Sequence, residues 1–224
     1  MVGYCGTNPR KGACMSLNTV CLRPMRRADI DALVDLLRRT WYADGDPQVQ
    51  TMVARADLEF CLARTTTAIV AEYQGHPVGV ALGHINRKSG GRFPVNRHHK
   101  AACKAMFRLM RTDEGCRGVR ELMVLGVEGE LMSATARRQG HTYDAEVILL
   151  ILDRMMQGSG VGARLFDGME QAFRQAGAQR YFLYTNTGCN VGFYDHRGLT
   201  RRIERTVPGK DGSATTYYLY DSVL

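Results

Sequence analysis

The chain has 224 residues, of which 45% are hydrophobic and 23% are charged, and its formal net charge is +8. This length suits one domain with a substantial core and is too short for a comfortable two-domain enzyme. No apolar run approaches the ~20 residues of a membrane-spanning helix, so we expect no membrane partner. The positive charge indicates an anionic partner, either the phosphates of a nucleotide-like molecule or a polynucleotide.

The basic residues lack the arrangement of a nucleic-acid surface. Arginine pairs stand apart at 38–39, 137–138 and 201–202, without interleaved aromatic residues and without helix-turn-helix or zinc-finger spacing. The adjacent His98 and His99 would point in different directions from a helix, which disfavours a shared metal. We therefore expect phosphate binding, no nucleic acid and no metal.

Residues 1–19 contain Gly, Asn, Pro, Lys and Cys without an apolar core segment. We expect a flexible tail there, and residues 1–14 need not belong to the native start. Because a secretory signal requires an apolar segment, we also expect a cytoplasmic location. Residues 20–224 then form a single domain, which acts as a monomer or a homodimer.

Hydrophobic periodicity predicts alternating strands and helices after this tail. Pro47 is expected to break the chain between the first two helices, and Gln74-Gly75-His76-Pro77 to form a hairpin turn. The expected elements of this half are strand 20–24, helices 28–40 and 49–63, and strands 67–72 and 78–85.

Residues 86–143 form a helical insertion between the third and fourth strands. Residues 98–111 place apolar side chains on one face and basic side chains on the other. A second helical piece, 119–138, is expected to be interrupted by Gly126 and Gly129. Long connections within a domain are often functional, so the insertion could select the substrate or could simply cap the sheet.

The second half begins with the apolar strand 145–152 and a glycine-rich turn. The expected elements after them are helix 161–176 with Gly177 at its end, strand 180–185, a short helix around Tyr194, and strands 199–207 and 214–220, which flank a turn at 208–213.

The turn after the apolar strand has the chemistry of a phosphate site. Glycines at 158, 160 and 162 remove the Cβ atoms that would keep an anion from the backbone. The free N–H groups of the following helix then point at the anion. The spacing G-x-G-x-G departs from both the dinucleotide fingerprint and the P-loop.

The pattern Gln-x-x-Gly-x-Gly does fit, at Gln157, Gly160 and Gly162, and here the sequence resembles the acetyl-CoA site of the GNAT superfamily of N-acetyltransferases. Two further segments agree in order. Residues 22–33 resemble the first strand and helix of that family, and residues 190–199, with Phe193-Tyr194 and Gly198-Leu199, resemble its closing segment.

The resemblance implies an α/β fold with a mixed, mostly antiparallel twisted sheet flanked by helices. It implies acetyl-CoA as acyl donor and a small-molecule or peptide amine as acceptor. The fourth and fifth strands of the family splay apart, which would leave backbone groups for the pantetheine arm. The residues implied for donor binding are Leu150, Ile151, Leu152, Gln157, Gly158, Ser159, Gly160, Val161, Gly162 and Asn190.

Acyl transfer to an amine needs a base, a stabilised oxyanion and a proton for the departing thiolate. Glu146 lies eleven residues before Gln157, an offset at which histone-type members of the family carry a general-base glutamate. The resemblance therefore implies that Glu146 is the base, directly or through water. The alternative is a carboxylate that caps the strand or pairs with an arginine.

Tyr194 matches the general acid of the family, and its alternative is a core aromatic that holds the last helix against the sheet. Whether Asn186, Thr187 or Asn190 contacts the cofactor stays open. We predict transfer of an acetyl group from acetyl-CoA to a primary amine in a ternary complex; the alternative is a non-catalytic acyl-CoA sensor or interaction module.

Overall fold

The computed structural model describes residues 20–86, 96–209 and 213–224. The predicted tail 1–19 lies outside these residues, as do 87–95 of the insertion and 210–212 of the last turn. The strands are β1 (Val20–Pro24), β2 (Thr67–Tyr73), β3 (His76–Ile85), β4 (Ala145–Leu152), β5 (Arg180–Asn186), β6 (Thr200–Pro208) and β7 (Ala214–Val223). The helices are α1 (Ile30–Trp41), α2 (Pro47–Arg64), α3 (Arg97–Leu109), α4 (Asp113–Arg138), α5 (Val161–Gln175) and α6 (Val191–His196), with 3-10 turns η2 (Arg27–Asp29) and η3 (Arg154–Met156).

The described strands form one sheet in the order β1-β2-β3-β4-β5-β7-β6. Each neighbouring pair is antiparallel except β4 and β5, which run parallel. This is the mixed, mostly antiparallel sheet predicted from the sequence. None of the helices within the described residues is long and apolar enough to cross a membrane.

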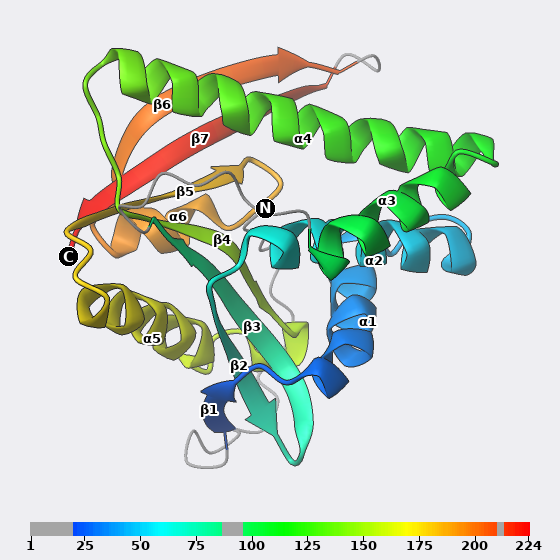
Figure 1. Ribbon diagram of the computed structural model, residues 1–224, viewed down its shortest axis with the longest axis horizontal. Helices are drawn as coiled ribbons and strands as arrows, with labels where there is room; N and C mark the ends of the chain where they lie inside the picture. Colours follow the sequence, from blue (N-terminus) through cyan, green and yellow to red (C-terminus); the bar gives the residue numbers. More distant parts are fainter. Residues whose placement is uncertain (1–19, 87–95, 210–212) are drawn as a thin grey trace.

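Helices cover both faces of the sheet, as Figure 1 shows. On one face α5 and α6 bury a cluster that includes Phe166, Phe173 and Tyr181. On the other face α1 and α2 bury a cluster that includes Leu36 and Leu58. Because every residue of β4 is buried, this strand lies at the centre of both clusters and can contribute side chains to sites on either face.

The start of α2 corrects the role predicted for Pro47. Pro47 is the first residue of the helix, and the carboxylate of Asp46 accepts hydrogen bonds from the N–H groups of Gln48 and Val49, both at 2.9 Å. Proline suits this position because its φ is already helical and its missing N–H would have no helical partner. Pro47 therefore begins the helix instead of breaking the chain.

The insertion is helical, as predicted, but its second helix is not interrupted. Helix α4 runs without a break from Asp113 to Arg138, through both Gly126 and Gly129. A glycine inside a helix costs about 1 kcal/mol relative to alanine, which packing at the two ends of α4 can offset. In Figure 1, α4 extends from β6 and β7 to the region of α2 and α3.

Candidate active site

The glycine-rich turn forms the connection from η3 to α5. Gly158 and Gly160 have φ angles of +73° and +79°, in the left-handed region where a side chain would be strained, and Gly160 is the N-cap of α5. A Cβ at Gly158 would meet nothing within 4 Å. The first N–H groups of a helix lack helical partners, so the turn presents donors and open space to an anion.

A cavity of about 280 Å³ lies beside this turn. Most of the residues predicted to bind the donor line this cavity. The exceptions are Ile151, Gln157, Ser159 and Val161. Ile151 belongs to the cluster on the opposite face of the sheet. The lining residues are Leu150, Leu152, Met156, Gly158, Gly160, Gly162, Ala163, Asn190, Phe193 and Tyr194.

Strands β4 and β5 separate beside the cavity. Their parallel register covers three residue pairs and ends at Val147 and Leu183, although β4 continues to Leu152 and β5 to Asn186. The in-register pairing of the two strands therefore stops at Val147, well before either strand ends. The separation corresponds to the splay that the resemblance implies.

A β-bulge occurs in β4 at the same point. Against β3, Leu82 pairs with Leu149 and Gly83 pairs with Val147, so Ile148 is an extra residue. An extra residue reverses the alternation of side chains between the two faces of a sheet. Glu146 and Ile148 consequently line a second pocket on the α2 side, whereas Leu150 and Leu152 line the small cavity on the α5 side.

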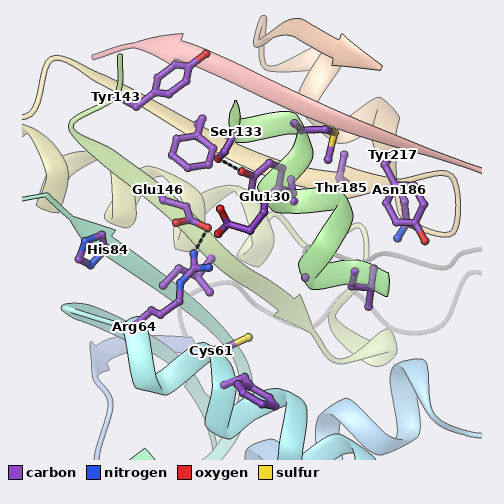
Figure 2. A pocket seen from close by; sticks show the side chains of 18 of the residues that line it. Cys61, Arg64, His84, Glu130, Ser133, Tyr143, Glu146, Thr185, Asn186 and Tyr217 are labelled. Atoms are coloured by element: carbon purple, nitrogen blue, oxygen red, sulfur yellow. Dashed lines mark hydrogen bonds and ion pairs between the residues drawn. The ribbon is translucent and has the colours of Figure 1, made fainter. Parts of the chain in front are cut away.

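The second pocket has a volume of about 820 Å³ and lies between α2, α4, β4 and β5. Glu146 enters it from β4 with 8% of its surface exposed and forms an ion pair with Arg64, the last residue of α2 (Figure 2). This pairing with an arginine is one of the two interpretations the sequence left open. It holds the carboxylate in the pocket lining.

Tyr194 is on the other side of the sheet, in the small cavity. Its side chain packs against Phe166, Phe193 and Tyr220. Burial raises the pKa of the Tyr194 phenol well above its usual value, with smaller contributions from Cys189 and Tyr220. The phenol is thus protonated at neutral pH. The two candidate catalytic residues line different cavities, and Tyr194 is both a core aromatic and a cavity residue.

The three polar candidates near α6 have different surroundings. Asn190 is the N-cap of α6, accepts a hydrogen bond from the Phe193 N–H at 3.2 Å, and lines the small cavity. Asn186 lines the large pocket. The Thr187 hydroxyl accepts from the Thr216 N–H at 3.2 Å. Of the three, only Asn190 is beside the glycine turn.

Several residues of the large pocket had not been predicted. Arg64 comes from α2, Glu130 and Ser133 come from α4, and Tyr184 comes from β5. The Ser133 and Tyr184 hydroxyls are hydrogen-bonded, and the side chain of Glu130 points toward the Arg64–Glu146 pair (Figure 2). The glycines of α4 were an available signal, because small residues on one helix face often mark the close approach of another group. Among the described residues, no group of three or more His, Cys, Asp or Glu side chains could hold a metal.

Comparison with solved structures shows a shared fold. A mosquito arylalkylamine N-acetyltransferase-like 5b is 16% identical with a TM-score of 0.58. An agmatine N-acetyltransferase in its apo form is 16% identical with a TM-score of 0.59, and a polyamine N-acetyltransferase of Drosophila melanogaster is 14% identical with a TM-score of 0.57. Each match covers 92% of this chain and 100% of the other chain.

No curated protein matches the sequence. The model of the acetyltransferase (GNAT) family matches residues 30–199, a range that extends from the start of α1 to the end of the α6 segment and includes the glycine turn, Glu146 and Tyr194. Since this match covers well over half of the chain, the protein belongs to the GNAT family of N-acetyltransferases.

Proposed function

We propose that the protein transfers an acetyl group from acetyl-CoA to a primary amine by direct attack in a ternary complex. The observation that supports this proposal best is the bulge in β4. It directs Glu146 toward the large pocket and Leu150 toward the small cavity at the point where β5 leaves β4. Strand β4 thereby borders both cavities, the small one for the donor and the large one for the acceptor.

The small cavity fits the acyl donor. The positive φ of Gly158 and Gly160 and the open space at Gly158 leave room for phosphate oxygens against the N-terminus of α5, where the helix dipole favours negative charge. Beyond Ile148, where β4 is no longer in register with β5, the edge of β4 offers backbone groups to an extended arm such as pantetheine. The thioester would supply the activated acyl group.

Glu146 and Tyr194 fill complementary roles in the proposed reaction. Glu146 accepts a proton from the ammonium of the acceptor, directly or through a water molecule, which frees the nitrogen lone pair. The nitrogen attacks the thioester carbon, a C–N bond forms and the C–S bond breaks. The buried, protonated phenol of Tyr194 gives its proton to the departing thiolate, and the second proton that the nitrogen loses as the amide forms restores the phenol.

The donor is tested first by thermal stability with and without acetyl-CoA. A ligand at ~100 times its dissociation constant adds roughly 2.7 kcal/mol to the free energy of unfolding, so we expect a clear rise in melting temperature. CoA release with a panel of amines then tests turnover. Glu146→Gln and Tyr194→Phe should keep the thermal shift and lower kcat by about 10²-fold or more.

Two results would contradict the proposal in different ways. If neither acetyl-CoA nor CoA changes the melting temperature, the small cavity is not a donor site. A normal shift without turnover of any amine would instead indicate a protein that binds acyl-CoA and does not catalyse transfer. Tyr73→Phe, a conservative change at a tyrosine that lines neither cavity, serves as a matched control for Tyr194→Phe.

A further inference from the structure

Helix α4 is attached to the domain at both of its ends. Near its start, Glu114 accepts a hydrogen bond from Gln50 of α2 at 2.7 Å. Gly118 packs so closely on α2 that an added Cβ would come within 2.6 Å of Val53. This contact holds the first turns of α4 against α2.

The last turns of α4 are held by the sheet. Met132 and Ala136 are buried in a cluster with Ile203 of β6 and Leu219 of β7. Arg205 of β6 donates to the carboxylate of Glu128 at 2.8 Å. Because the helix is fixed at each end, its central turns form a roof over the large pocket.

The surfaces that enclose this pocket are mainly apolar and aromatic. The roof contributes Leu122, Met123, Leu125 and Gly126. The walls contribute the rings of Phe60, Tyr143, Phe182, Tyr184 and Tyr217. A volume of about 820 Å³ lies within the range of ~300–1,000 Å³ that is typical of sites for whole small molecules.

The polar end of the pocket favours a cation. Glu146 already accepts the guanidinium of Arg64, and Glu130 points toward the same pair (Figure 2). Two carboxylates thus face one cationic side chain at the end of the pocket where β4 carries its bulge. Arg137, His84 and His141 line other parts of the wall.

We propose that the acceptor is a small primary amine with an aromatic or other bulky apolar body. The body lies under the central turns of α4, between the rings, and the ammonium group lies between Glu130 and Glu146. Because α4 is fixed at both ends, we expect the pocket beneath it to take a compact acceptor better than an extended polypeptide. The inference rests on the proposed function and adds to it the class of acceptor and a recognition role for Glu130.

The test uses the full chain, saturating acetyl-CoA, and release of CoA with tryptamine, ethylamine and a lysine-containing hexapeptide as acceptors. We expect kcat/KM to be highest for tryptamine. Gly126→Trp should narrow the pocket, since a Cβ at Gly126 meets nothing within 4 Å. It should lower kcat/KM for tryptamine about tenfold, or ~1.4 kcal/mol, and change the value for ethylamine much less.

Val127→Trp is the matched control, because Val127 is on the same helix, is 54% exposed and does not line the pocket; its kinetics should equal those of the unchanged protein. Glu130→Gln should raise KM for tryptamine several-fold, whereas Glu121→Gln, also on α4 and not lining the pocket, should not. The thermal shift with acetyl-CoA confirms that each variant is folded.

Preference for the hexapeptide, or equal effects of Gly126→Trp and Val127→Trp, would overturn the inference and leave amine acetylation in place. If no amine is acetylated while acetyl-CoA still raises the melting temperature, the proposed function fails, and the inference fails with it.

Discussion

Gly160 and Gly162 lie two residues apart, but the backbone requires glycine only at the first. Gly160 has φ of +79°, where an L side chain is strained. Gly162 is inside α5, and an added Cβ would make an ordinary contact with Leu152 at 3.7 Å. Both line the small cavity. Alanine at Gly160 would add both a methyl group and backbone strain, whereas alanine at Gly162 would add the methyl group alone. Comparing the two variants therefore isolates the effect of the strain.

Gly160→Ala should lower the free energy of unfolding by about 1–2 kcal/mol, the cost of a left-handed alanine. Gly162→Ala should leave it unchanged or raise it, because alanine is the better helix former. Urea unfolding of the two variants measures the difference. Equal stability of the two would contradict the assigned backbone geometry.

The ion pair between Arg64 and Glu146 could not be predicted from the sequence. The two residues are 82 positions apart, and an arginine in the last turn of a helix is common because it complements the helix dipole. The glycine turn could be recognised because its chemistry depends on neighbouring residues. The partner of Glu146 depends instead on how α2 packs against the sheet.

At the scale of elements, α4 has two methionines with different surroundings. Met132 is 1% exposed and packs against the last strands, whereas Met123 is 59% exposed at the pocket. Met132→Ala should lower the free energy of unfolding by about 2–5 kcal/mol, as is typical for a buried methionine. Met123→Ala should change it by less than about 0.5 kcal/mol. Chemical denaturation tests both, and a similar loss at both sites would mean that α4 is not anchored as described.

Strand and helix types followed from periodicity and turn residues, but the sequence misled in two places. The sequence predicts a break at Pro47, which is the first residue of α2. It also predicts an interruption at Gly126 and Gly129, which lie within the continuous helix α4. The sequence carries the signal for Pro47, because Asp46 directly before it is a capping residue and proline suits the first helical position. It carries none for the glycines, whose helix is continuous because its ends are anchored by distant elements.

Buried phenols give the whole molecule a predictable response to alkali. Burial raises the pKa values of Tyr42 and Tyr194 well above the usual value, and Tyr42 also donates to Asp57 at 2.8 Å. An unfolded tyrosine ionises at about pH 10. Above that pH the native state holds protons that the unfolded state releases, so stability is fully present below about pH 10 and falls as the pH rises further.

The urea concentration at the midpoint of unfolding should therefore be lower at about pH 11 than at about pH 8. Tyr42→Phe removes one of these phenols and should make the decline shallower. It should also lower stability at neutral pH, because Asp57 loses the Tyr42 hydroxyl and keeps only the weaker Cys61 thiol as a side-chain donor. An equally steep decline in this variant would show that Tyr42 does not hold its proton in the native state.

The extra residue in β4 also bears on how the two substrates of the proposed reaction bind. Because Ile148 reverses the side-chain alternation, the small cavity proposed for the donor lies on the α5 face of the sheet and the large pocket proposed for the acceptor lies on the α2 face. If the two substrates bind as proposed, each occupies its own cavity and neither blocks the cavity of the other. We therefore expect initial-rate kinetics in which acetyl-CoA and the amine bind in either order, with their reacting groups meeting where β4 carries its bulge.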